Sequence, residues 1–152
     1  MRLSKKGEYA IKALLELALN QKNGINTTLI TNIAEQENIP QRYLEHILLS
    51  FKNSGMLISK RGVGGGYTLN KLPRNISLGD IIRVADGPLS PLSYRDPKDD
   101  EELEGISEGL RGIMKEVGNA MKKIVDNISL EDMVKRTLDL IEQKKNVPNY
   151  VI

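Results

Sequence analysis

Apolar residues recur every three to four positions through the first third of the chain, which is the spacing of helices that bury one face. We predict a first helix over 4–22, which Ser4 caps and which ends at Asn23-Gly24. Its apolar face consists of Ile11, Leu14, Leu15 and Ala18.

Two shorter helices are predicted to follow. The first covers 29–37, with Thr28 as its cap. The second covers 40–54, with Pro40 at its first position, where the missing N–H of proline costs nothing. Their apolar positions are Leu29, Ile30 and Ile33 in the first helix, and Leu44, Ile47, Leu48 and Phe51 in the second.

A β-hairpin is predicted after the third helix. Stretches with strand character at 57–60 and 66–69 flank the tip 61–65, whose glycines predict a flexible end. A fourth helix is predicted over 77–85, because a serine and an aspartate open it at the spacing of a capping box.

The second half of the chain begins with a polar segment and continues with helical patterns. Residues 88–104 contain three prolines and the acidic run 99–102, which predicts a solvated loop or a disordered connector. A long amphipathic helix is predicted over 105–127, and a last helix, which Ser129 caps, over 130–145. The last helix is predicted to bury Leu130, Met133, Val134, Leu138 and Ile141.

Four glycines interrupt the long helix, and each costs ~1 kcal/mol relative to alanine in a helix interior. They are Gly105, Gly109, Gly112 and Gly118. The helix must regain this free energy by packing, either against the rest of its own chain or against another subunit.

The composition narrows the class of protein. Hydrophobic residues make up 39% of the chain and charged residues 28%, while aromatic residues make up only 4%, so the core must be aliphatic, which suits packed helices. The absence of cysteine excludes disulfides, thiolate metal sites and a cysteine nucleophile. Neither an apolar run of about 18 residues nor a signal-peptide pattern is present, so we expect a cytoplasmic protein without a membrane helix.

Charge is distributed unevenly along the chain. Residues 1–87 contain 12 Lys and Arg against 7 Asp and Glu, whereas residues 88–152 contain 10 against 13. A basic first part suggests contact with a polyanion such as DNA, although many mildly basic domains bind none.

Helix, break, helix and hairpin follow one another in the order of a winged helix-turn-helix domain. The exposed face of a helix about 10–12 Å wide can reach base edges in the major groove of B-DNA. Opposite the apolar stripe of the helix 40–54 lie Arg42, His46, Leu49 and Asn53, with Tyr43 and Glu45 beside them. Arg42 can pair with guanine or phosphate, and Glu45 can accept from a cytosine amino group; ordinary solvated residues are the alternative.

The hairpin tip carries a second candidate contact. Lys60 and Arg61 precede three consecutive glycines at 64–66, and a thin basic loop can approach phosphates or enter a minor groove. A nucleotide-binding loop does not fit, because the glycines do not follow G-x-G-x-x-G, no helix starts directly after them and a Walker lysine is missing. A flexible turn without a ligand is the remaining alternative.

A series of short motifs over residues 1–88 stands at the spacing of a known family. The motifs are Leu3-Ser4 with Gly7 and Tyr9-Ala10; Ile33-Ala34, Ile39 and Tyr43-Leu44-Glu45; Gly55 with Leu57-Ile58; Arg61-Gly62 with Gly64-Gly65-Gly66-Tyr67; and Asp80-Ile81-Ile82 with Gly87. On these motifs the chain resembles the Rrf-two family of winged helix-turn-helix transcription regulators.

The resemblance implies a homodimer that binds a partly palindromic operator in double-stranded DNA, with the wing arginine in the minor groove. Pattern and resemblance together predict that the DNA-binding residues are Thr28, Gln41, Arg42, Tyr43, Glu45, His46, Lys60, Arg61, Gly62 and Gly64. The long C-terminal helix is implied to form the dimer interface through Ile106, Leu110, Ile113, Val117, Met121 and Ile124.

The chain departs from the family in one respect. Many members hold an iron–sulfur cluster through three cysteines in the loop after the fourth helix, and this chain has no cysteine, so we predict no cofactor and no metal. The branch of cysteine metabolism repressors also lacks the three-cysteine set and is the nearer analogy, and such members can be controlled by a partner protein. His46 lies far from that loop in sequence, so we expect it to contact DNA or solvent.

Two other classes of function compete with DNA regulation. Catalysis is not expected, because the acidic run 99–104 does not supply convergent oxygens for a cation and no nucleophile elbow is present. A dimeric protein-interaction adaptor with reduced or lost DNA binding is the other alternative, and the intact wing and recognition positions argue against it. The loop 88–104 lies where relatives sense their signal, so it is a candidate docking site for a regulatory partner protein or a small effector.

These observations predict a mainly α fold with four parts. We expect a winged helix-turn-helix DNA-binding domain with a small two-stranded wing over 1–87, an acidic loop over 88–104, a helical dimerisation region over 105–145 and a tail over 146–152. The expected function is transcription regulation, by repression rather than activation.

Overall fold

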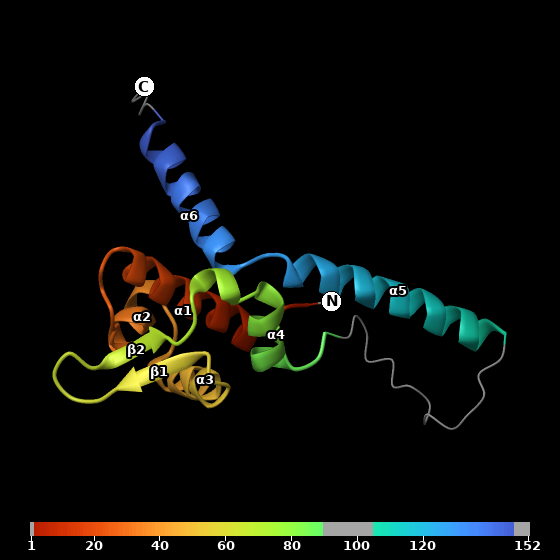
Figure 1. Ribbon diagram of the computed structural model, residues 1–152, viewed down its shortest axis with the longest axis horizontal. Helices are drawn as coiled ribbons and strands as arrows, with labels where there is room; N and C mark the ends of the chain where they lie inside the picture. Colours follow the sequence, from red (N-terminus) through yellow and green to blue (C-terminus); the bar gives the residue numbers. More distant parts are fainter. Residues whose placement is uncertain (1, 90–104, 148–152) are drawn as a thin grey trace.

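The computed structural model describes residues 2–89 and 105–147, which form a mainly helical fold with one two-stranded antiparallel sheet (Figure 1). The elements are α1 (Lys5–Lys22), α2 (Ile30–Glu37), α3 (Gln41–Asn53), β1 (Leu57–Lys60), β2 (Gly66–Leu69), the 3-10 helix η1 (Pro73–Asn75), α4 (Leu78–Asp86), α5 (Ile106–Asp126) and α6 (Leu130–Lys145). The predicted fold class is confirmed. None of these helices is long and apolar enough to cross a membrane.

Helix α1 is the central element of the first domain and contacts α2, α3, α4, α6 and β2. It begins where the Ser4 hydroxyl accepts a hydrogen bond from the Gly7 N–H at 2.9 Å, as the sequence predicts. The buried face is wider than predicted, because it also includes residues such as Ala13 and Leu17. Ile11 and Leu15 lie at its edge and are only half-buried. Its buried residues are Gly7, Ala10, Ala13, Leu14, Leu17 and Ala18.

Helices α2 and α3 form the predicted helix-turn-helix, and Asn38 makes the turn between them with a left-handed φ of 52°. Two details of their starts were predicted wrongly. Leu29, not Thr28, is the N-cap of α2, and Pro40 is the N-cap of α3 rather than its first helical residue. The reason for the first error is that Thr28 pairs with Tyr67 in an isolated β-bridge, which takes it out of the helix start.

The hairpin has the predicted strands, which pair in the register Leu57↔Leu69 and Lys60↔Gly66. Leu57 and Leu69 point into the core, and the other end of the hairpin extends from the domain as a wing (Figure 1). The tip is a turn closed by a hydrogen bond from the Gly65 N–H to the Gly62 carbonyl at 2.9 Å. The flexibility that the glycines suggest for this end stays a prediction.

The junction of η1, α4 and α6 was not predicted. Ser77 and Ser129 face each other in an isolated β-bridge, in which Leu78 N–H donates to Ile128 at 2.8 Å and Leu130 N–H donates to Ile76 at 2.7 Å. Both serines open capping boxes, with Asp80 in α4 as predicted and with Asp132 in α6. The bridge therefore fixes the start of α6 against the start of α4.

Helix α6 packs only its first half against the domain. Leu130 and Val134 are buried in the same core as α1, whereas Ile141 is 45% exposed, so the prediction that Ile141 is buried is wrong. The cause is the direction of α6, which projects away from the domain beyond its first turns (Figure 1). The predicted domain boundary at residue 87 stays a prediction. Leu130 and Val134 lie beyond that boundary in the sequence, but they pack into the core of the N-terminal domain.

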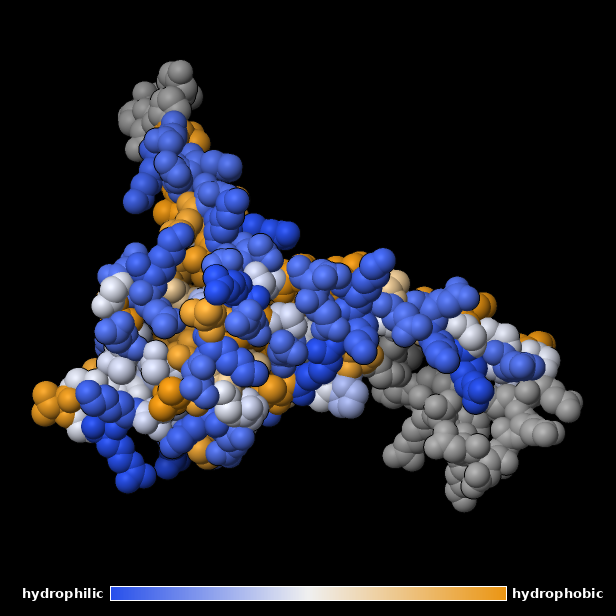
Figure 2. All heavy atoms as spheres, in the orientation of Figure 1, coloured by the Kyte–Doolittle hydropathy of each residue, from blue (hydrophilic) through white to orange (hydrophobic). Residues whose placement is uncertain are grey.

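Helix α5 projects from the junction in another direction and contacts the rest of the described chain mainly through α4 (Figure 1). None of its residues is buried. Most of its stripe is exposed, with 91% of Ile106 and 60% of Ile113 accessible, whereas Met121 is half-buried. Apolar side chains lie between hydrophilic ones on its surface (Figure 2). Residues 90–104, which contain most of the predicted acidic loop, and the tail from 148 lie outside the described residues.

Candidate nucleic-acid interface

The N-terminal half of α3 presents one polar surface to solvent. Its buried side is formed by Leu44, Ile47, Leu48 and Phe51, as predicted. All five residues predicted to contact DNA from this helix are exposed, namely Gln41, Arg42, Tyr43, Glu45 and His46. Within this surface the Gln41 amide donates to the Glu45 carboxylate at 3.3 Å. A helix with one buried and one polar face can lie in a major groove without exposing its core.

Tyr43 is held by an aromatic contact that the sequence did not predict. Its ring lies edge-on to the ring of Tyr9 in α1, with centroids 5.7 Å apart and an interplanar angle of 77°. Lys5 Nζ lies 5.6 Å from the centroid of the Tyr9 ring, within the range of a cation–π contact. The start of α1 therefore supports the start of α3, although no sequence pattern links the two tyrosines.

The wing residues predicted to contact DNA are also exposed: Lys60, Arg61, Gly62 and Gly64. Within the described ranges, no carboxylate lies in salt-bridge distance of Arg42, Lys60 or Arg61. These three cations are therefore available to an external anion such as a phosphate. Their charges lie on α3 and on the hairpin, the two elements that a winged helix-turn-helix domain places against DNA.

Lys5, at the start of α1, differs from these cations because it has an acidic neighbour. Its Nζ lies 3.0 Å from a Glu8 carboxylate oxygen, and Lys12 Nζ lies 3.3 Å from the other oxygen. The hydrogen bond to Glu8 raises the pKa of Lys5, and the hydrogen bonds from Lys5 and Lys12 lower the pKa of Glu8. DNA would have to compete with Glu8 for this ammonium group.

Thr28 has a different role from the one predicted. Only 4% of it is exposed, and its hydroxyl accepts a hydrogen bond from the Asn20 side chain at 3.1 Å. Its backbone N–H and carbonyl pair with Tyr67 at 2.9 and 2.8 Å. The expectation of a Thr28 side-chain contact to DNA is therefore corrected, because the side chain is buried and Thr28 instead fixes the base of the wing.

The glycines after the tip permit close packing of the wing. A Cβ on Gly65 would lie 2.5 Å from the Lys60 carbonyl oxygen and 2.7 Å from that of Gly62. A Cβ on Gly66 would overlap the carbonyl oxygen of Thr28. These glycines therefore permit backbones to approach closely, both within the wing and between the wing and Thr28. The sequence alone did not distinguish this role from flexibility.

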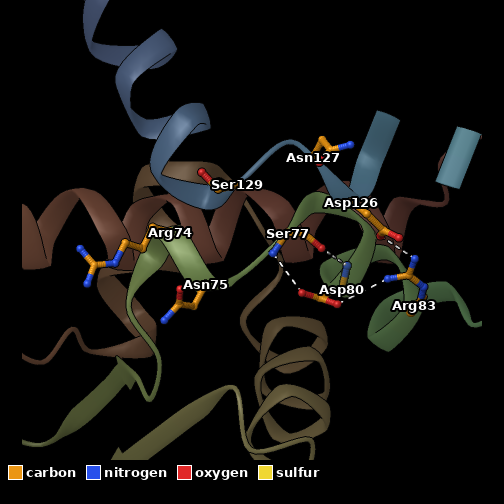
Figure 3. Close-up of a pocket in the computed structure, with 8 residues that line it drawn as sticks. All are labelled: Arg74, Asn75, Ser77, Asp80, Arg83, Asp126, Asn127 and Ser129. Atoms are coloured by element: carbon orange, nitrogen blue, oxygen red, sulfur yellow. Dashed lines mark hydrogen bonds and ion pairs between the residues drawn. The ribbon is translucent and has the colours of Figure 1, made fainter. Parts of the chain in front are cut away.

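A polar pocket of about 410 Å³ lies at the junction of η1, α4, α5 and α6, and it was not predicted. Figure 3 shows Arg83 bonded to Asp80 in its own helix and to Asp126 at the end of α5. The Arg74 guanidinium points away from that group. The lining residues are Arg74, Asn75, Ser77, Asp80, Arg83, Asp126, Asn127 and Ser129. Its charged groups hold α4 against α5, so the pocket is a structural joint.

Metal ligands do not gather in the part of the chain that the structure describes. Across 2–89 and 105–147 there is no group of three or more His, Asp or Glu side chains that could hold an ion. His46, the one histidine of the sequence, lies on the exposed face of α3.

Comparison with known proteins places these features in a family. A family profile described as Rrf2, iron-dependent transcriptional regulator, matches residues 3–136. The HTH-type transcriptional regulator CymR of Bacillus subtilis is 36% identical over 137 residues, covering 90% of this chain and 92% of the relative. The HTH-type transcriptional regulator IscR of Pectobacterium carotovorum is 29% identical over 150 residues, covering 95% of this chain and 87% of the relative.

Solved structures agree with the sequence comparison. The structure of CymR, described as the global cysteine regulator of B. subtilis, superposes with a TM-score of 0.74 at 34% identity, covering 90% of this chain and 98% of that one. The structure of IscR from T. potens superposes with a TM-score of 0.73 at 29% identity, covering 90% of this chain and 88% of that one. The predicted resemblance is thereby confirmed.

The iron in the family description can be tested against the donors of this chain. A cluster needs soft ligands, above all cysteine thiolates, and the sequence has no cysteine and one histidine. The histidine lies on α3, and it belongs to no group of three or more potential metal ligands among the described residues. The residues present therefore do not fit a thiolate-bound cluster.

Proposed function

The chain belongs to the Rrf2 family of transcriptional regulators, and from this premise we propose that it is a homodimeric repressor that binds a partly palindromic DNA operator. The observation that carries the proposal is the pairing of an exposed polar α3 face with a basic wing whose cations have no acidic partner among the described residues. Arg42, Tyr43 and Glu45 would contact base edges, while Arg61 would enter the flanking minor groove. Gln41, His46, Lys60, Gly62 and Gly64 would complete the contact surface.

The homodimer part of the proposal rests on α5. An isolated helix that exposes an apolar stripe and carries glycines in its interior would be unstable without a partner. A second copy of α5 would cover Ile106, Leu110, Ile113, Val117, Met121 and Ile124. Two recognition helices joined in this way would contact major-groove surfaces about 34–36 Å apart, one turn of B-DNA.

Control without an iron–sulfur cluster is the third part of the proposal. The lack of cysteine thiolates supports this part. Without a cluster, a small effector or a partner protein would control DNA binding, and the loop 88–104 is the candidate docking site for it. Repression is proposed because a dimer bound across a promoter excludes polymerase without any further contact.

The experiment that tests this function is recovery of genomic DNA fragments bound by the purified full-length protein, followed by a salt titration on the tightest fragment. We expect a common sequence with two-fold symmetry and an affinity that falls steeply with salt, since cations on both wings displace counterions. Weak binding without a common sequence would contradict the proposal and favour the dimeric adaptor.

A further inference from the structure

The wing tip carries an apolar side chain that the fold does not use. Val63 is 103% exposed, the highest value among the large hydrophobic residues that the structure describes. An apolar patch is visible at the end of the hairpin (Figure 2). Single exposed apolar residues are common, so the exposure of Val63 needs support from its setting.

The turn holds Val63 in a defined place. Gly62 and Gly65 close a four-residue turn, in which Val63 is the second residue and Gly64, with a φ of 71°, is the third. A positive φ at the third position suits glycine, whereas the second position tolerates many residues and favours proline. The Thr27 hydroxyl donates to the Gly64 carbonyl at 2.9 Å and ties the tip to the loop before α2. Nothing in this turn requires a β-branched apolar residue at 63.

The tip is also narrow. Of the residues 61–65, only Arg61 and Val63 have side chains, since the other three are glycines. The minor groove of B-DNA is only about 6 Å wide, so a tip with few side chains is of the kind that can enter it. The walls of that groove are deoxyribose rings, whose C–H groups offer an apolar surface between the phosphates.

We propose that Val63 is a DNA-contacting residue, which packs against the deoxyribose walls of the minor groove while Arg61 supplies the charge. The inference rests on the proposed function, because it assumes that the wing binds DNA. Proteins that bind the minor groove frequently combine cationic side chains with apolar ones that enter the groove, and the apolar side chains add contact without adding charge.

The test compares Val63→Ala and Val63→Ile with the wild-type protein on the tightest genomic fragment, by fluorescence anisotropy over a range of salt. Val63→Ala removes the two methyl groups that would pack against the groove, so it should weaken binding by about fivefold or more. The dependence of affinity on salt should not change, because no charge is removed. Val63→Ile should bind at least as well as wild type, and hydroxyl-radical protection of the flanking minor groove should be weaker in Val63→Ala only.

Leu72→Ala is the matched control, because Leu72 is a half-exposed apolar residue after the opposite end of the hairpin. It should leave DNA affinity unchanged. Val63→Ala should have the melting temperature of the wild-type protein, because the Val63 side chain packs against no other residue in the free protein. Wild-type affinity in Val63→Ala would overturn the inference and point to another role for the tip, such as a protein contact, without affecting the proposed function. A failure of wild type to bind any common sequence would instead refute the proposed function.

Discussion

Arg61 is the single residue on which DNA affinity should depend most. It stands at the exposed tip of the wing, next to a turn whose backbone is fixed by hydrogen bonds, and no acidic group of the described residues neutralises it. A guanidinium presented by a narrow loop suits the negative potential of a minor groove.

Thr28 shows the limit of residue-level prediction, because a hydroxyl next to a helix start has the same sequence signature whether it caps the helix or is buried in a bridge.

Arg61→Ala is expected to weaken DNA binding by about tenfold or more and to reduce the salt slope by about one for each wing bound. Anisotropy titrations at several salt concentrations measure both quantities. The control is Arg74→Ala, which removes the same charge from an exposed residue in η1, and which should change neither quantity. Unchanged affinity in Arg61→Ala would show that the wing does not bind DNA and would favour the adaptor.

Helix boundaries could be predicted from the sequence because caps and apolar spacing are local signals. The start of α1 at Ser4 and the capping box of α4 are two such cases, and both are present in the structure. The Ser77–Ser129 bridge and the Tyr9–Tyr43 contact could not be predicted, because each joins segments that lie far apart in the sequence and leave no periodic pattern. The exposed face of the predicted recognition helix, α3, by contrast followed directly from its apolar stripe.

The capping box of α6 has a measurable pH dependence. The Asp132 carboxylate accepts hydrogen bonds from the Ser129 N–H and hydroxyl at 2.9 and 2.8 Å, and these bonds lower its pKa. A lowered folded-state pKa means that the stabilisation is complete above the ordinary pKa of about 3.9 and is lost as pH falls through the lowered value. Stability from this cap should therefore be present at neutral pH and absent in strong acid.

Asp132→Asn should accordingly be less stable than wild type at neutral pH, with the difference shrinking well below about pH 4. Urea unfolding at the two pH values measures the difference directly. Asp139→Asn removes the same charge from the exposed side of the same helix and should have little effect at either pH. An equal difference between Asp132→Asn and wild type at both pH values would contradict the account of this cap.

At the scale of the whole molecule, α5 is the feature that a single chain leaves incomplete. It leaves the domain at the joint where Arg83 bonds Asp126, and the rest of the described chain buries none of its residues. The joint also sets how α5 is oriented relative to α3, and so would set the distance between two recognition helices in a dimer. The sequence predicted the stripe, but its exposure became visible only once the direction of α5 was known.

Ile113→Asp should convert the dimer to a monomer, because a carboxylate in the middle of an apolar interface would be buried without a partner. Sedimentation equilibrium measures the mass, and DNA affinity should fall with it, since one recognition helix would then bind alone. Asn119→Asp adds the same charge on the opposite side of α5 and should remain dimeric. A dimeric Ile113→Asp protein would mean that another surface joins the subunits.

The central claim, that a symmetric dimer binds two half-sites of one operator, is tested most directly by moving those half-sites apart. Inserting half a helical turn, about 5 base pairs, at the centre of the recovered operator rotates one half-site to the opposite face of the duplex. We predict that affinity then falls to the level of a single half-site, while the same insertion outside the operator has no effect. Affinity that is unchanged by the central insertion would contradict the account, because it would mean that the two half-sites are not bound by one rigid dimer.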